Sequence, residues 1–296
     1  MTTLITGASG FLGSNLAHQL AAEQTIIIGT YRTRPIVIPG VSMVALDLLD
    51  LQSVSRVVAD CRPDVVIHCA AQADVERAQA SPHEAEQINW LGTRKLVASL
   101  SADAYLINIS TDNVYDGAKG WFVETDEPAP INEYGRTKVL AEQEVRRFTG
   151  DWVILRIALL YGGRSEYRLC FCDRLYNQLK EGKRATLFTD EHRTPLHVED
   201  VTSAIRALLV YRPTEEIFNL GGPDRVSRAD FGRILAEQIG LDASLIDRIP
   251  ASAVPTRAPR PKDLSLCSDK IGSAMRIRTT PVREGIARTY RQSPAT

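Results

Sequence analysis

The stretch Thr3-Leu4-Ile5-Thr6-Gly7-Ala8-Ser9-Gly10-Phe11-Leu12-Gly13 decides the fold class of this chain. A short apolar run comes first, three spaced glycines follow it, and leucines at helical spacing continue from Leu12. Glycines at such a junction let the backbone turn sharply and approach a pyrophosphate, whose charge then meets the N–H groups at the start of the helix. The spacing is G-x-x-G-x-x-G rather than G-x-G-x-x-G, but its place between strand and helix predicts a dinucleotide-binding turn.

The rest of the chain repeats this alternation of short apolar runs and longer amphipathic stretches. The runs cover residues 25–29, 43–46, 65–69, 104–109 and 152–157. Runs this short and continuous are typical of strands buried on both faces, and their alternation with helical patterns indicates parallel pairing. We therefore expect an α/β fold with a doubly wound parallel Rossmann sheet and a smaller, mainly helical C-terminal substrate-binding part.

The regular alternation of strand and helix patterns stops after about residue 162. This change indicates where the chain divides into two domains. Helical patterns follow at 170–180 and 201–210, and a late apolar run follows at 217–220. We expect a dinucleotide-binding Rossmann domain made of residues 1–162 with 194–224. The substrate-binding domain is expected to take residues 163–193 with 225–296.

The composition argues against several classes of protein. The chain has 296 residues, and its 35 Lys and Arg against 36 Asp and Glu leave a net charge of -1, which gives no reason to expect nucleic acid or an anionic membrane as a partner. The five cysteines contain no C-x-x-C pair, which argues against disulfides and structural zinc and fits a reducing cytoplasm. No apolar run approaches the roughly 20 residues that span a bilayer, and the first strand pattern leaves no room for a signal peptide.

The basic C-terminal segment and three of the histidines can each be interpreted without a catalytic role. Residues 251–296 carry nine Lys or Arg but three Asp or Glu. This segment is either a solvated face balanced by acidic helices elsewhere or a basic wall that faces an anionic ligand. His192 and His197 lack a third ligand, so we expect no metal site there. His68 stands in a buried run and is interpreted as a core residue.

The end of the second strand bears on the choice of cofactor. It reads Thr30-Tyr31-Arg32-Thr33-Arg34, where NAD-specific folds place a carboxylate for the ribose hydroxyls. Arg32 and Arg34 are either solvated or form charge-assisted bonds to a 2′-phosphate, so we expect NADP(H) as the preferred cofactor and NAD(H) as the alternative. The next strand closes at Asp47-Leu48, placed to contact the adenine, although Asp47 equally suits capping of the following helix.

A hydroxyl-rich strand end and a Tyr-x-x-x-Lys pattern predict acid–base chemistry. Ser110-Thr111-Asp112-Asn113 ends a buried strand, and Tyr134 and Lys138 follow at an interval that places them on one helix face. The Lys138 ammonium is then expected to lower the pKa of the phenol and to bind the cofactor ribose. Tyr115/Lys119 and Tyr176/Lys180 repeat the pattern, but only Tyr134 follows the strand end by a suitable interval.

These residues together resemble the extended short-chain dehydrogenase/reductase family. The resemblance rests on Gly7, Gly10 and Gly13, on Cys69-Ala70-Ala71 after the fourth strand, on Asn89 heading a helix, and on Thr111, Tyr134 and Lys138. Within that family the chain is most similar to the dTDP-4-dehydrorhamnose reductase group, through residues 62–66, 110–117, 130–135, 155–157 and 260–262. The resemblance extends over nearly the whole chain.

The resemblance implies a set of site residues. In such enzymes the Thr111 and Tyr134 hydroxyls would hold a sugar ketone, Tyr134 would donate the proton with the help of Lys138, and the nicotinamide would deliver hydride. The implied cofactor contacts are Gly7, Ser9, Gly10, Phe11, Leu12, Gly13, Arg32, Asp47, Leu48, Cys69, Ala70, Ala71, Asn89, Tyr134, Lys138 and Ile157. The implied substrate contacts are Thr111, Asp112, Leu159, Arg193 and Arg260, the two arginines being assigned to a substrate diphosphate.

Two departures from the family pattern narrow the expected activity. Sugar-nucleotide dehydratases carry a glutamate where this chain has Asn113, so dehydration is not expected. Leu159 stands where the reductase group often has an aromatic residue that lines the sugar site. This difference leaves the identity of the sugar undetermined.

The resemblance implies NADPH-dependent reduction of a nucleotide-linked 4-keto (deoxy)sugar in deoxysugar biosynthesis, by a cytoplasmic enzyme and potential homodimer. Two alternatives stay open. One is an NADP-binding regulatory subunit, because residues 155–157 and 195–198 also resemble the methionine adenosyltransferase regulatory β-subunit. The other is a nucleotide-sugar epimerase.

Overall fold

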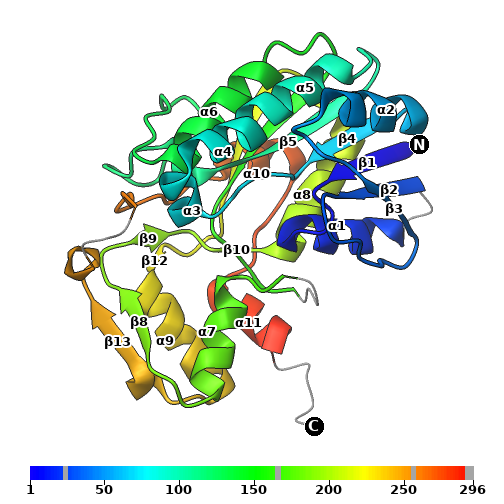
Figure 1. Cartoon of the computed structure of the whole chain (residues 1–296). Helices are drawn as coiled ribbons and strands as arrows, with labels where there is room; N and C mark the ends of the chain where they lie inside the picture. The colour runs from blue at the N-terminus through cyan, green and yellow to red at the C-terminus, as the bar shows by residue number, and fades with distance from the viewer. Residues whose placement is uncertain (23–25, 164–167, 255–257, 291–296) are drawn as a thin grey trace.

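The computed structural model describes residues 1–22, 26–163, 168–254 and 258–290. A large part built on a parallel sheet lies above a smaller part in Figure 1. The expected strand at 25–29 corresponds to β2, whose described residues are Ile26–Tyr31, and residue 25 lies outside the described ranges. No helix within these ranges is long and apolar enough to cross a membrane.

The large part contains a parallel sheet of seven strands, which confirms the expected fold class. Its order is β11-β6-β5-β4-β1-β2-β3, so the direction of winding reverses between β1 and β4. Ligands of doubly wound sheets bind at the carboxyl edge beside such a reversal. The strands are β1 (Thr2–Thr6), β2 (Ile26–Tyr31), β3 (Val41–Ala45), β4 (Val65–His68), β5 (Tyr105–Thr111), β6 (Trp152–Ile157) and β11 (Glu216–Leu220).

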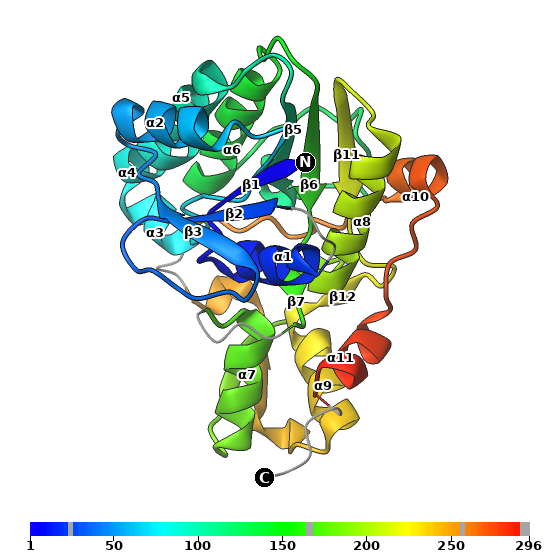
Figure 2. The same ribbon diagram turned by 90° about the vertical axis from the view of Figure 1, so that its right-hand side faces the viewer.

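Helices cover both faces of this sheet, as Figure 2 shows. One face carries α2 (Leu51–Cys61), α3 (Val75–Ala80), α4 (Pro82–Glu86), the π-helical turn η1 (Gln87–Leu91), α5 (Gly92–Ser99) and α6 (Glu133–Val145). The other carries α1 (Phe11–Ala21), α8 (Val198–Tyr211) and α10 (Asp269–Met275). Every residue of β4, β5 and β6 is buried between the two layers, as their continuous apolar runs predicted.

The smaller part has its own apolar core below the sheet. It contains α7 (Phe171–Lys180), β8 (Ala185–Phe188), α9 (Arg228–Ile239), β13 (Ile246–Ile249) and α11 (Val282–Tyr290). The parallel pair β8–β13, which sequence analysis did not predict, backs α9. Leu175, Phe231 and Ile286 are buried together there.

Three 3-10 turns complete the helical elements. They are η2 (Asp112–Val114), which directly follows β5, η3 (Ala243–Leu245) and η4 (Ala251–Ala253).

Two short strand pairs join the parts. β7 (Leu160–Tyr161) pairs with β10 (Leu196–His197) in parallel, and β9 (His192–Arg193) pairs with β12 (Val226–Ser227) antiparallel. The chain then returns to the large part, because Leu264, Leu266, Ile271 and Met275 pack into the core of the sheet.

The basic C-terminal segment is largely paired with carboxylates from other elements. Four of its cations form such pairs, namely Arg260 with Glu76, Lys270 with Glu216, Arg283 with Glu237, and Arg288 with Glu199. Residues 255–257 and 291–296 of the segment lie outside the described ranges. These four cations are therefore balanced by carboxylates of other elements, and a role of the segment toward an anionic ligand stays a prediction.

Candidate active site

The turn between β1 and α1 has the geometry that a pyrophosphate requires. Gly7 has a φ of +68°, and a Cβ added there would stand 2.7 Å from the Ala70 Cα. A Cβ on Gly13 would stand 2.3 Å from the Gly7 carbonyl oxygen, so a side chain fits at neither position. Gly10 is the N-cap residue of α1, and no side chain caps the helix. The first N–H groups of α1 therefore remain available to bind an anion.

The ends of β2 and β3 hold the residues expected at the adenosine half of the cofactor. Arg32 and Arg34 directly follow β2 and are exposed, and no described carboxylate forms an ion pair with either. Asp47 accepts a hydrogen bond from the Leu49 N–H at 2.9 Å, while Asp50 is the residue that caps α2. The alternative that Asp47 caps this helix is therefore wrong.

Buried polar side chains tie the end of β4 to the end of β1. The Thr6 hydroxyl lies 2.7 Å from His68 Nδ1 and accepts the Ala70 N–H at 3.2 Å. His68 Nε2 lies 3.0 Å from the Thr93 hydroxyl. Burial lowers the pKa of His68 to about 3, so the imidazole is neutral at physiological pH. His68 is a bonded core residue, as the sequence indicated, and it holds the Cys69–Ala71 loop beside the glycine turn.

Asn89 does not head a helix, contrary to the sequence-based expectation. It lies inside η1, which joins α4 and α5 into one helical run. Its side chain accepts the Gln72 N–H at 2.7 Å and donates to the Gln72 carbonyl at 3.1 Å and the Thr137 hydroxyl at 2.9 Å. A π-helical turn changes the direction of the side chains that follow, a feature that the apolar period does not reveal. The assignment of Asn89 to cofactor binding stays a prediction.

Thr111 and Tyr134 lie together at the carboxyl end of the central strand β5. Tyr134 is on the first turn of α6, whose N-cap residue Asn132 accepts the Gly135 N–H at 2.8 Å. Burial raises the pKa of Tyr134 to about 12, an effect opposed by a hydrogen bond with the Thr111 side chain. The phenol is therefore protonated at neutral pH, which is the form that a proton donor needs.

Lys138 lies one turn further along α6 and is buried. Its ammonium donates to the Ile109 carbonyl at 2.8 Å. Burial lowers the pKa of Lys138 to about 8, opposed by the carboxylate of Glu142. The expected lowering of the Tyr134 pKa by Lys138 is wrong for this structure, because the lysine side chain reaches the strand backbone and burial dominates at the phenol.

The other two Tyr-x-x-x-Lys copies have structural roles. The Tyr115 hydroxyl donates to the Val123 carbonyl at 3.0 Å and accepts from Arg156 at 2.8 Å within the core. Tyr176 stacks on Tyr290 in the smaller part, with ring centres 4.7 Å apart. Among the described residues, neither tyrosine has Thr111 as a partner.

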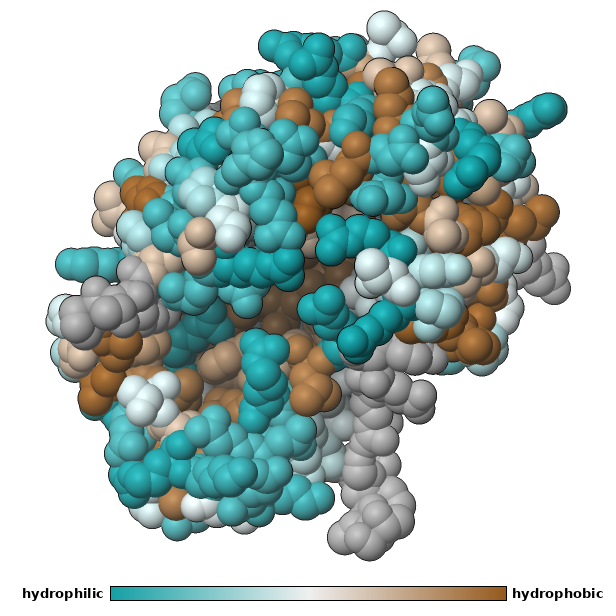
Figure 3. All heavy atoms as spheres, viewed as in Figure 1, coloured by the Kyte–Doolittle hydropathy of each residue, from teal (hydrophilic) through white to brown (hydrophobic). Residues whose placement is uncertain are grey.

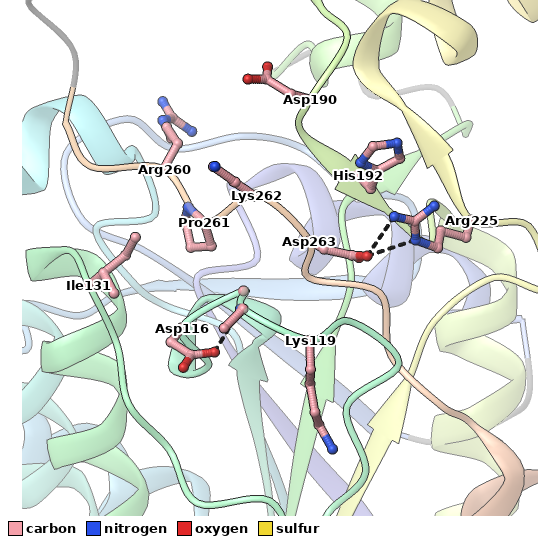
Figure 4. Close-up of a pocket in the computed structure, with 12 residues that line it drawn as sticks. Asp116, Lys119, Ile131, Asp190, His192, Arg225, Arg260, Pro261, Lys262 and Asp263 are labelled. Carbon is pink, nitrogen blue, oxygen red and sulfur yellow. Dashed lines mark hydrogen bonds and ion pairs between the residues drawn. The ribbon is translucent and has the colours of Figure 1, made fainter. Parts of the chain in front are cut away.

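The cleft between the two parts is hollowed in Figure 3 and includes a pocket of about 800 Å³. Arg260, Lys262 and His192 line this pocket, and Arg225 pairs with Asp263 at its edge (Figure 4). Of the site residues expected from the sequence, the pocket lining includes Arg260.

Arg193 and Asp112 lie in a buried position close to Thr111. Arg193 Nε is 3.9 Å from Asp112 Oδ2, and its Nη1 donates to the carbonyls of His192 at 2.6 Å and Pro261 at 3.2 Å. Burial raises the pKa of Asp112, opposed by the charge of Arg193. Arg193 therefore stands beside Asp112, the residue that follows Thr111 in the chain.

Comparison with known proteins places this architecture in a family. A family model described as "RmlD substrate binding domain" matches residues 1–294. The chain belongs to this RmlD family. The match spans both parts of the structure, so the expected resemblance to the dTDP-4-dehydrorhamnose reductase group is confirmed.

Individual relatives of this RmlD-family chain differ in their described roles. It is 32% identical over 266 residues to a probable low-salt glycan biosynthesis reductase of Haloferax volcanii, covering 88% of each chain. It is 30% identical over 291 residues to methionine adenosyltransferase 2 subunit beta of Mus musculus, covering 96% of this chain and 85% of that one. The solved dTDP-4-dehydrorhamnose reductase of Bacillus anthracis, in complex with NADP, has the same fold, with a TM-score of 0.87, 24% identity and 99% of each chain covered.

A buried ion pair beneath the end of β5 was not predicted from the RmlD-family sequence. Glu142 accepts from Arg156 Nε at 3.0 Å, from Arg156 Nη2 at 2.7 Å and from the Ser110 hydroxyl at 2.5 Å. The signal available was the spacing of Glu142, four residues after Lys138 and so on the same face of α6. Its partner on β6 could not be identified without the register of β5 against β6.

His197 has protein partners in this RmlD-family structure. The His197 ring accepts the Glu199 N–H at 3.4 Å at the start of α8, and its Nε2 lies 3.1 Å from the Thr289 hydroxyl. Within the described ranges, no group of three His, Cys, Asp or Glu is placed to hold a metal ion. The two hydrogen bonds of His197 join the start of α8 to α11.

Proposed function

We propose that the protein reduces a nucleotide-linked 4-keto sugar with NADPH. The observation that carries the proposal is the placement of a buried, protonated Tyr134 beside Thr111 at the sheet edge that also presents the glycine turn. A ketone whose oxygen lies between these two hydroxyls would accept a hydrogen bond from each. As the carbonyl carbon is reduced, Tyr134 transfers its proton to the oxygen.

The residues at the sheet edge fit a dinucleotide. The Gly7 and Gly13 cradle, which a Cβ would fill, and the free N–H groups of α1 would hold the pyrophosphate. Arg32, exposed and without a described carboxylate partner, would hold the 2′-phosphate that distinguishes NADP from NAD. Bound NADPH supplies the hydride. The NADP in the structurally similar Bacillus anthracis reductase supports this choice of cofactor.

Lys138 would keep the cofactor ribose and the tyrosine in place. Its ammonium is anchored to the Ile109 carbonyl, within the strand that ends at Thr111. With a pKa of about 8 it is charged at neutral pH and able to donate to a ribose hydroxyl. After proton transfer, the same positive charge would stabilise the phenolate until solvent returns the proton.

The test is the loss of NADPH absorbance when the purified protein is mixed with nucleotide-linked 4-keto sugars. Tyr134→Phe should lower kcat by about 10²–10⁴, the range typical of general acid catalysis, with NADPH affinity nearly unchanged. Tyr176→Phe is the matched control, because that hydroxyl lies in the smaller part. Equal loss of turnover in both variants, or full activity of Tyr134→Phe, would show that another group donates the proton.

A second candidate function is regulation of a partner enzyme. It is favoured by the 30% identity, over nearly the whole chain, to methionine adenosyltransferase 2 subunit beta. A regulatory subunit would bind NADPH through the same turn without turning over a keto sugar. NADPH binding without oxidation across a panel of keto sugar nucleotides would favour this second function over the first.

A further inference from the structure

Arg228 is a largely buried cation with one unpaired guanidinium nitrogen, Nη1. It is the first residue of α9, and its side chain is 15% exposed. The Glu191 carboxylate lies 4.0 Å from its Nε, which is too far for a hydrogen bond, and Nη1 is sealed from solvent without a partner. Within the described ranges, the guanidinium therefore has a carboxylate at ion-pair distance, but its Nη1 N–H donors are buried and unsatisfied. Buried polar groups are normally paired, so this exception requires an explanation.

Backbone pairing holds Arg228 beside the cleft. β12 pairs with β9, so Ser227 lies opposite His192, and the Arg228 N–H donates to the Glu191 carbonyl at 3.1 Å. The guanidinium lies over the Phe171 ring, with its carbon 4.5 Å from the ring centre. A ring contact of this kind orients the guanidinium plane without using its N–H donors.

Arg228 belongs to a cluster of three arginines with Arg193 and Arg260. Burial, together with the charges of Arg193 and Arg260, lowers the pKa of Arg228 to about 9. Arg260 contributes a second buried and unpaired donor, its Nε. These are the two buried guanidinium nitrogens without a partner in the described part of the chain, and both lie in this cluster. Mutual repulsion and unpaired donors in one place indicate an anion that the cluster binds.

We propose that Arg228 is a further substrate-binding residue, which acts with Arg193 and Arg260 to bind the diphosphate of a nucleotide-linked substrate. This inference rests on the proposed function, because it takes the cleft as the site of a nucleotide sugar. A diphosphate presents charged oxygens on two phosphorus atoms, so several guanidiniums can donate to it together. A monophosphate offers fewer acceptors and would leave part of the cluster unpaired.

A binding role and a purely structural role make opposite predictions for the protein without ligand. If Arg228 binds the substrate, Arg228→Gln removes a charge that two neighbours repel, so the Tm of the free protein should stay the same or rise. If Arg228 holds the fold together, the same change should lower the Tm. The matched control is Arg233→Gln on the same helix, whose side chain is exposed and pairs with Glu237.

The experiment measures Kd for dTDP, UDP and UMP by calorimetry, together with the Tm of each free protein. Loss of one or more charge-assisted hydrogen bonds should weaken dTDP or UDP binding to Arg228→Gln about 10- to 150-fold, with a smaller effect on UMP. Arg233→Gln should bind like wild type. Diphosphate affinity within about twofold of wild type, or an equal loss in both variants, would overturn the proposal. A lower Tm together with equal losses for UMP and UDP would also overturn it, in favour of a structural role.

Failure of this inference can be separated from failure of the proposed function. Diphosphate binding that depends on Arg228, in a protein that reduces no keto sugar, would support the arginine assignment and reject the reductase. Turnover of a keto sugar nucleotide with the same KM in wild type and Arg228→Gln would support the reductase and reject the arginine assignment.

Discussion

Replacing Glu142 by glutamine should leave the Arg156 guanidinium as an uncompensated charge in the core. Arg156 is fully buried, and Glu142 is 2% exposed. The carboxylate accepts three hydrogen bonds, two from Arg156 and one from Ser110. Removing one partner of a buried pair costs about 3–5 kcal/mol, because the remaining charge keeps its desolvation penalty without its Coulomb gain. We expect Glu142→Gln to lower the free energy of unfolding by about that amount.

A double-mutant cycle separates this effect from the value of the pair. Replacing both groups, as Glu142→Gln with Arg156→Met, removes the buried charge altogether, so the double variant should be more stable than Glu142→Gln alone. Urea unfolding measures all three variants. The control is Glu84→Gln, which breaks the exposed pair with Arg77 and should change stability by about 1 kcal/mol or less. A loss below about 1.5 kcal/mol for Glu142→Gln, or a double variant that loses the sum of the single losses, would refute the reasoning.

The same substitution has a consequence at the active site. The charge of Glu142 opposes the lowering of the Lys138 pKa, so its removal should shift that pKa below its present value of about 8. NADPH affinity in Glu142→Gln should then begin to fall at a lower pH than in wild type. Titration of NADPH binding across pH measures this shift, and unchanged profiles would show that Glu142 does not act on Lys138.

Two further predictions concern cofactor choice and acid stability. Arg32→Ala should weaken NADPH binding about 10- to 150-fold and leave NADH binding nearly unaffected, because only NADPH carries the 2′-phosphate. Fluorescence titration with each cofactor measures this, and equal losses of affinity for both would contradict the prediction. The folded-state pKa of His68, about 3, lies below its unfolded value of about 6.5. The contribution of the neutral imidazole to stability is therefore lost as pH falls between these values, by up to about 5 kcal/mol. His68→Gln should flatten the decline of unfolding free energy over that pH range, and a decline as steep as in wild type would count against this assignment.

Local sequence was sufficient to predict the sheet and the glycine turn between β1 and α1. Continuous apolar runs require strands buried on both faces, and these were found at β4, β5 and β6. The glycine turn depends on residues within one short segment, so spacing alone predicted it. Tyr134 could be distinguished from Tyr115 and Tyr176 because the distinction rests on order along the chain.

Tertiary packing decided the features that join distant segments. Asn89 was expected at the head of a helix, but it lies in a π-helical turn, where its side chain bonds to Gln72 and Thr137 from other segments. The expected effect of Lys138 on Tyr134 failed for the same reason, since the lysine side chain reaches the Ile109 carbonyl on the neighbouring strand.

By itself, the sequence determined the fold class, the glycine turn and which tyrosine lies beside Thr111, because periodicity and short spacings fix these within one or two elements. Only the tertiary structure decided that Glu142 would meet Arg156 and that Arg228 would stand beside Arg193. The first contact depends on the pairing of β5 with β6, and the second on the pairing of β9 with β12. Strand register between separated segments follows from the packing of the whole core, which no local pattern in the chain encodes.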